Sequence, residues 1–147
     1  MRRVGEASDI YPPVYARADA ATMVAWLEQG VGLIAAVIED DDRVVAHVRL
    51  ESLDPRAAAL CGPGPWVEAS RLMVDPACRR RGYARALLAW ADTARPPASR
   101  LALVVMAKNL LARRAYEALG WSYVGAFPGR NGENFVMVPH RLDPSGW

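Results

Sequence analysis

Residues 72–88, with the sequence LMVDPACRRRGYARALL, decide the fold of this chain. The segment begins with apolar residues that suit a strand, breaks at an Asp-Pro pair and ends in residues that favour a helix. Between them lie four arginines within seven residues around Gly82. The first N–H groups of a helix have no partner inside the helix, and the helix dipole favours an anion there. Gly82 leaves room for a phosphate beside the backbone, and arginines add forked donors, so the segment predicts a phosphate-binding turn.

The turn itself, RRRGYA at residues 79–84, fits the pattern Arg/Gln-x-x-Gly-x-Gly/Ala. It resembles the pyrophosphate loop of the GNAT superfamily of acyl-CoA-dependent N-acetyltransferases, and the preceding residues 72–76 resemble the fourth strand of that superfamily. The turn lacks the Gly-Lys-Ser/Thr ending of a P-loop and has only one glycine, so it is not a Rossmann motif. For these six residues alone, a solvated basic helix start is the alternative.

Length and composition restrict the class of protein. A chain of 147 residues predicts one domain, residues 1–147, with a core of ordinary size. Apolar residues make up 52% and charged residues 23%, which is typical of globular proteins rather than disordered or membrane-spanning ones. No apolar run approaches the roughly 18 residues of a membrane-spanning helix, and no apolar core of a signal peptide follows the initial Met-Arg-Arg. We therefore expect a cytoplasmic protein with no membrane partner.

The net charge argues against a nucleic-acid-binding protein, and the spacing of the possible metal ligands argues against a metalloprotein. The net charge of +2 is too small to indicate nucleic acid as the main partner. The two cysteines, Cys61 and Cys78, and the two histidines, His47 and His140, have no metal-ligand spacing, so we expect no metal. Cys78 lies beside the basic turn, but no histidine is near it in sequence, and we interpret it as incidental.

Apolar runs and alternation predict a mixed sheet with helices packed on it. The expected strands are 33–38, 43–51, 66–74, 101–106, 121–124 and 135–138, and the expected helices are 17–28, 81–94 and 109–119. Residues 52–65 contain three prolines and two glycines and are expected to form a loop.

The order of these elements combines an antiparallel hairpin at 33–51 with a right-handed parallel crossover at 66–106. We therefore expect an α+β fold with a sheet of six or seven strands and about four helices. The order also resembles the GNAT fold, in which the fourth and fifth strands run parallel and splay apart to admit the pantetheine arm. The first strand of that fold is hard to recognise here, and residues 1–5 are the candidate remnant.

A second motif follows the strand at 101–106. Asn109, Ala112 and Tyr116 fall on one helical face, with Gly120-Trp121 after the helix, and this resembles the GNAT pattern Asn-x-x-Ala-x-x-x-Tyr. The resemblance implies that Asn109 holds the cofactor arm and that the Tyr116 hydroxyl protonates the departing CoA thiolate. The alternatives are a helix cap for Asn109 and a core aromatic for Tyr116. The cofactor-binding residues that the two motifs imply are Leu72, Met73, Val74, Arg79, Arg80, Arg81, Gly82, Tyr83, Ala84, Arg85, Asn109 and Ala112.

Two carboxylates are candidates for the base that removes the proton from the attacking amine. Strand alternation would place Glu68, Ser70, Leu72 and Val74 on one face and Arg71 on the other. Glu68 lies eleven residues before Arg79, a spacing that resembles the base of the histone-acetylating branch of the superfamily. Glu51 is the second candidate, and for both the alternative is a surface or salt-bridged carboxylate. Backbone N–H groups near Met73 and Val74 are the expected donors to the thioester carbonyl.

Together these observations predict an N-acetyltransferase that moves an acetyl group from acetyl-CoA to a primary amine by direct transfer in a ternary complex. The catalytic residues would be Tyr116 and Glu68, and the acceptor a small-molecule or peptide amine. A homodimer is possible by analogy with the superfamily. Two alternatives are an acyl-CoA-binding sensor or regulatory protein without turnover, and a small basic nucleic-acid-binding protein built on residues 79–85.

Overall fold

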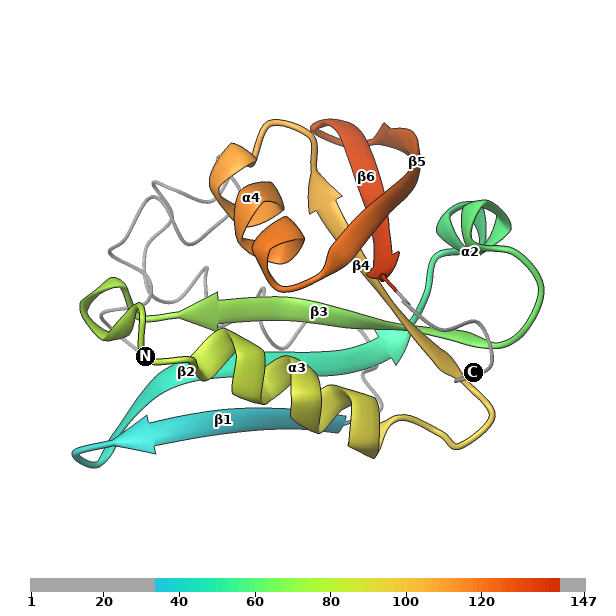
Figure 1. The fold of residues 1–147 in the computed structure, drawn as a ribbon. Helices are drawn as coiled ribbons and strands as arrows, with labels where there is room; N and C mark the ends of the chain where they lie inside the picture. The colour runs from blue at the N-terminus through green and yellow to red at the C-terminus, as the bar shows by residue number, and fades with distance from the viewer. Residues whose placement is uncertain (1–33, 141–147) are drawn as a thin grey trace.

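The structure, a computed structural model, describes residues 34–140. Within this range six strands form one sheet in the order β1-β2-β3-β4-β6-β5 (Figure 1). The elements are β1 (Ile34–Asp40), β2 (Arg43–Ser52), α2 (Pro55–Cys61), β3 (Trp66–Val74), the 3₁₀ helix η2 (Pro76–Cys78), α3 (Tyr83–Ala94), β4 (Arg100–Met106), α4 (Leu110–Ala118), β5 (Trp121–Gly129) and β6 (Gly132–Pro139). The predicted α+β fold with a mixed sheet is confirmed. The helix expected at 17–28 and the strand remnant at 1–5 lie outside the described residues.

A tight hairpin joins β1 and β2. Asp41 and Asp42 both adopt positive φ, 49° and 58°, which is the geometry of a two-residue turn that follows the twist of the strands. The antiparallel hairpin predicted at this acidic segment is therefore confirmed, with Asp40 as the last residue of β1. The carboxylate of Asp40 is 3.0 Å from Nη1 of Arg81, so the hairpin tip contacts the basic turn before α3.

The prediction of a loop throughout residues 52–65 was wrong, because α2 forms there. Asp54 caps this helix by accepting a hydrogen bond of 2.8 Å from the N–H of Arg56, and Pro55 occupies its first turn. A proline in the first helical turn costs no hydrogen bond, so it begins the helix instead of breaking it. Ala57 is fully buried in an apolar cluster with Trp66 and Phe127, which fixes the helix on the sheet.

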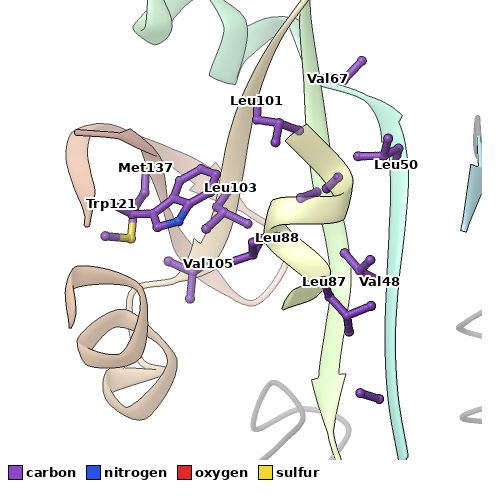
Figure 2. Packing of buried hydrophobic residues seen from close by; sticks show 13 residues of the cluster. Val48, Leu50, Val67, Leu87, Leu88, Leu101, Leu103, Val105, Trp121 and Met137 are labelled. Atoms are coloured by element: carbon purple, nitrogen blue, oxygen red, sulfur yellow. The ribbon is translucent and has the colours of Figure 1, made fainter. Parts of the chain in front are cut away.

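The main core lies between α3 and the sheet. Figure 2 shows Leu87 and Leu88 of α3 among Val48, Leu50 and Val67 of the first strands, with Leu103, Val105, Trp121 and Met137 beyond them. These side chains are at most 7% exposed. Removing this much apolar surface from water fixes α3, and therefore its first turn, relative to β3 and β4.

The two parallel strands separate along their length. β3 pairs with β4 only at Trp66↔Arg100, Val67↔Leu101 and Glu68↔Ala102. Beyond this point β4 pairs with β6, from Leu103↔Met137 onward, while β3, among the strands that the structure describes, continues beside β2 alone. Figure 1 shows the two arrows diverging, with α4 above the opening. The splayed parallel pair that the resemblance implied is confirmed.

A β-bulge interrupts β3 just after this divergence. His47 lies opposite Met73 and Arg49 lies opposite Ser70, so β3 carries one extra residue in the interval. Arg71 adopts a φ of +50° there. The extra residue reverses the alternation, and Leu72 and Val74 pack on the α3 side together with Val67 and Ala69. The prediction that Glu68, Ser70, Leu72 and Val74 share one face was therefore wrong.

Candidate active site

A cavity of about 200 Å³ occupies the opening between β3 and β4. Its walls come from four elements, β3, β4, α4 and β6. The lining residues are Glu68, Ala69, Ser70, Arg71, Leu72, Met73, Val104, Val105, Met106, Asn109, Ala112, Tyr116 and Asn134. The structure thus brings together both predicted catalytic residues and four of the predicted cofactor-binding residues, Leu72, Met73, Asn109 and Ala112. Val74 and the basic turn at 79–85 are not part of this lining.

The basic turn follows the carboxyl end of β3 and leads into α3. Gly82 is the N-terminal cap of α3 with a φ of +78°, and a Cβ placed on it would meet no atom within 4 Å. The first bond of the helix runs from the N–H of Ala86 to the carbonyl of Gly82, at 3.0 Å, so the N–H groups before it have no helical acceptor. Arg80, Arg81 and Arg85 are exposed here. This geometry suits an anion that approaches the backbone closely.

Asn109 was predicted to hold the cofactor arm, with a helix cap as the alternative role. Its Oδ1 accepts a hydrogen bond of 3.2 Å from the N–H of Ala112, so the residue does cap the helix. The side chain also lines the cavity, where its amide nitrogen is a donor. Capping and ligand binding are therefore compatible, because they use different atoms of the same amide.

Two carboxylates lie directly opposite each other on β2 and β3. Glu51 and Glu68 are cross-strand partners, which brings their side chains to the same face of the sheet. Oε2 of Glu51 is 2.7 Å from Nη1 of Arg71 and 3.2 Å from Nε of Arg49. Arg71 therefore reaches the face that carries Glu68, so its predicted place on the opposite face was wrong. Its guanidinium donates a hydrogen bond to the carboxylate of Glu51.

The environment of Glu68 changes its proton affinity. Burial, together with the negative charge of Glu51, raises the pKa of Glu68 to about 8 despite the opposing charge of Arg71. Glu51 instead has two arginines on its carboxylate. An ion pair favours the charged form of a carboxyl group, whereas burial and a neighbouring like charge favour the neutral form. Glu68 can thus exchange a proton near neutral pH.

Tyr116 faces the cavity from the middle of α4. Burial, and to a smaller extent the negative charge of Glu68, raises the pKa of its hydroxyl to about 12. The phenol therefore keeps its proton throughout the physiological range and can act only as a donor of that proton. A group that accepts a proton near pH 8 and a group that donates one consequently line the same cavity.

Several cavity residues were not identified from the sequence. Asn134 of β6 lies opposite Met106 at the end of β4, and no local pattern marks it. Ser70 lines the cavity next to the bulge, and its hydroxyl is 3.4 Å from the carbonyl of Arg49. Both positions depend on how distant strands pair, which spacing along the chain does not reveal.

A second hollow, of about 270 Å³, lies between α3 and the start of β5. It is larger than the cavity between β3 and β4, but among the predicted site residues it contains only Arg85. Of the predicted site residues that line either hollow, all but Arg85 therefore lie in the smaller one. Among residues 34–140, no group of three or more His, Cys, Asp or Glu side chains is arranged to hold a metal ion. Over the same residues, no helix has the length and apolar character that crossing a membrane requires.

Comparisons with known proteins agree with this architecture. No curated protein sequence matches the chain significantly. Among solved structures, a GNAT-family protein from Desulfovibrio desulfuricans is 21% identical, with 92% of this chain and 87% of that chain covered and a TM-score of 0.64. NAA60 from Arabidopsis thaliana, in complex with a bisubstrate analogue, is 19% identical, with 83% and 82% covered and a TM-score of 0.59.

The same plant protein in complex with acetyl-CoA is 20% identical, with 70% of this chain and 71% of that chain covered and a TM-score of 0.54. The ribosomal-protein-S18-alanine N-acetyltransferase from Escherichia coli is 18% identical, with 85% and 81% covered and a TM-score of 0.54. At these identities the likeness shows the fold. The profile of the acetyltransferase (GNAT) family matches residues 4–121, which is most of the chain, and the protein therefore belongs to the GNAT acetyltransferase family.

Proposed function

We propose that this protein is an N-acetyltransferase that transfers the acetyl group of acetyl-CoA directly to a primary amine within a ternary complex. The observation that carries the proposal is the opening after Glu68, where the edge of β3 faces a cavity of about 200 Å³ that also holds Asn109 and Tyr116. Family membership and the acetyl-CoA complex of the plant relative NAA60 support the choice of cosubstrate.

The cosubstrate would follow the open edge of β3. Beyond Glu68 this edge pairs with no strand among residues 34–140, so its N–H and C=O groups can pair with the amides of pantetheine as a neighbouring strand would. The pyrophosphate would then lie at the start of α3, over Gly82 and among Arg79, Arg80 and Arg85. Arg81 is partly committed to Asp40, so we expect it to contribute less.

Glu68 is the proposed base. A general base works best when its pKa lies near the working pH, and Glu68, at about 8, meets this condition. Glu51 is less suitable, because its carboxylate is paired with Arg49 and Arg71 and does not line the cavity. We propose that Glu51 instead raises the proton affinity of Glu68 through its charge.

Tyr116 is the proposed acid. The amine nitrogen attacks the thioester carbon, the amine proton passes to Glu68, the C–S bond breaks, and the thiolate takes the proton of the Tyr116 hydroxyl. The charge of Glu68 contributes to the high pKa of Tyr116, so its neutralisation in the first step makes Tyr116 a stronger acid for the second. Transfer of the proton from Glu68 to the tyrosinate restores both groups to their resting state.

The tetrahedral intermediate needs hydrogen-bond donors at its oxygen. We propose that the backbone N–H of Leu72, in the bulged stretch of β3, supplies one of them, since Leu72 lines the cavity. The acceptor is proposed to be a small-molecule or peptide amine. The name of the Escherichia coli relative specifies the alanine of a ribosomal protein, which supports testing peptide N-termini first.

The experiment that tests this proposal mixes the protein with acetyl-CoA and a panel of peptide and small-molecule amines and measures released CoA thiol. Turnover with any amine supports an enzyme. Binding of acetyl-CoA without turnover on a broad panel supports the alternative, an acyl-CoA-binding regulatory protein. Absence of acetyl-CoA binding contradicts both.

Tyr116→Phe removes only the hydroxyl of the proposed acid. We expect kcat to fall by about tenfold to ten-thousandfold, the range for one general acid, while the dissociation constant of acetyl-CoA stays nearly constant. Tyr123→Phe is the matched control, since Tyr123 is 54% exposed on β5 and does not line the cavity. An unchanged rate for Tyr116→Phe would remove this residue from the mechanism.

A further inference from the structure

The bulge in β3 holds a residue in a strained conformation. Arg71 has a φ of +50°, in the left-handed region that glycine usually occupies at such bulges. A residue with a Cβ enters this region only when its surroundings compensate for the steric cost. Contacts that hold Arg71 are therefore part of what keeps the bulge in place.

Two residues of β2 hold Arg71 from the same face of the sheet. Nδ1 of His47 is 2.9 Å from the carbonyl oxygen of Arg71, and Oε2 of Glu51 is 2.7 Å from its Nη1. A carbonyl oxygen can only accept, so the hydrogen of the first contact belongs to Nδ1 of His47. Glu51 thus fixes the side chain of Arg71, and His47 fixes its backbone.

The contact with His47 also sets the direction of a neighbouring donor. The carbonyl of Arg71 and the N–H of Leu72 belong to one planar trans peptide unit, in which they point in opposite directions. Because the carbonyl points to His47, the N–H of Leu72 points away from it. Leu72 lines the cavity between β3 and β4, so the orientation of this peptide unit decides which backbone atom it offers there.

We propose that His47 is a positioning residue for acetyl transfer, which acts by holding the peptide unit between Arg71 and Leu72 in the orientation that the reaction needs. This inference rests on the proposed function, because the N–H of Leu72 is there a donor to the tetrahedral intermediate. His47 itself does not line the cavity, so its effect passes through the backbone of the bulge. Its loss should therefore reduce kcat more than it reduces the affinity for acetyl-CoA.

Two substitutions separate the hydrogen bond from the volume of the side chain. His47→Leu fills a similar space without a donor, whereas His47→Asn places an amide N–H close to the position of Nδ1. We expect kcat to fall about tenfold to a hundredfold in His47→Leu, within the range for a misplaced oxyanion donor, and to recover to within about threefold of the wild type in His47→Asn. The dissociation constant of acetyl-CoA should change by less than about threefold in both.

His140→Asn is the matched control, since His140 is the other histidine of the chain and is exposed at the end of β6. Its kcat should equal that of the wild type. Equal kcat for His47→Leu and wild type, or equal losses in His47→Leu and His47→Asn, would overturn the proposal.

A measurement on the unmodified protein keeps the inference testable if His47→Leu does not fold or if no acceptor is found. Burial lowers the pKa of His47 below its usual value, so its ring is neutral at pH 8. In protein labelled with ¹⁵N-histidine, the structure then requires a hydrogen on Nδ1 and none on Nε2, and His140→Asn assigns the signal. The opposite tautomer would overturn the role of His47, whereas absence of acetyl transfer beside the expected tautomer would contradict the proposed function alone.

Discussion

The two halves of β3 share β2 as a neighbour on one edge and differ on the other. From Trp66 to Glu68 the strand also pairs with β4, whereas from residue 69 onward that edge faces a cavity. The closed half carries apolar residues that are at most 9% exposed, and its partner Ala102 is fully buried. The open half contains the bulge, a half-buried arginine and the polar groups of the cavity.

This difference shows how one strand serves both stability and binding. In the closed half β3 pairs with β4 on one edge and, at Val67 and Glu68, with β2 on the other, and the side chains add to two apolar clusters. In the open half the outer edge does not pair with β4, and it faces a cavity that a ligand can enter. Glu68 stands at the boundary, as the last residue of β3 that pairs with β4. A larger side chain beside the open half should therefore weaken acetyl-CoA binding. A larger side chain in the closed half should instead lower the free energy of unfolding.

The largest effect, on acetyl-CoA affinity, is expected from a bulky side chain in the cavity beside the open half. Ala112 of α4 lines the cavity and is half-buried, so Ala112→Trp would place an indole in the proposed path of pantetheine. We expect the affinity for acetyl-CoA to fall roughly a hundredfold or more, equivalent to about 2.7 kcal/mol, because the ligand and the ring compete for one space. Isothermal titration calorimetry measures the loss.

The matched control is Ala115→Trp, because Ala115 lies on the same helix but is exposed. It should bind acetyl-CoA as the wild type does. Ala112 also packs against the main core, so the unfolding free energy of both variants in denaturant is measured alongside binding to separate a loss of stability from a loss of affinity. Undiminished binding by Ala112→Trp would show that the cavity is not the path of the cosubstrate.

In the closed half a larger side chain is expected to have a smaller effect, on stability rather than on acetyl-CoA binding. Ala102 is 0% exposed and packs with Trp66, Phe127 and Val136, so Ala102→Leu adds three carbon atoms where there is no room. Overpacking of this kind lowers the free energy of unfolding by about 1–3 kcal/mol. The variant that remains folded should still bind acetyl-CoA. Urea unfolding measures the first quantity, and loss of binding without loss of stability would contradict the division between the two halves.

Local patterns in the sequence were sufficient for the closed half and for the helices around the site. An apolar run identified β4, because a strand buried on both faces leaves a continuous signal. Helical spacing brought Asn109 and Tyr116 together, and the arginines around Gly82 marked the start of α3. All of these features depend on residues within two helical turns or one strand of each other.

The features that the sequence did not reveal depend on pairing between distant segments. The bulge is held at Arg71 by His47 and Glu51, which are 24 and 20 residues away in sequence. The opposition of Glu51 and Glu68 likewise follows from the register of β2 against β3. α2 was missed for another reason, because Pro55 was interpreted as a breaker although it stands in a first helical turn. β5 was expected to end at residue 124 but extends to Gly129, since an edge strand tolerates Pro128.

The smallest expected effect concerns Glu68, at the boundary of the two halves. Its pKa in the folded protein is about 8, above the ordinary value of 4.5 that applies to the unfolded chain. The folded state therefore binds this proton more tightly, and the stability that the protonated group contributes is complete below pH 4.5 and is lost as the pH rises through about 8. Within this window one such group changes the free energy of unfolding by about 1.4 kcal/mol per pH unit.

Glu68→Gln cannot titrate, so the variant should lack this part of the pH dependence. The unfolding free energies of wild type and Glu68→Gln are measured in urea at pH 6 and at pH 7. As the pH rises, the wild type should lose about 1.4 kcal/mol relative to Glu68→Gln. Contributions of all other groups that titrate equally in both proteins cancel in this difference. A constant difference would mean that the Glu68 carboxyl titrates in the folded protein as it does in the unfolded chain, and a base with a pKa near the working pH would then have to be sought elsewhere in the cavity.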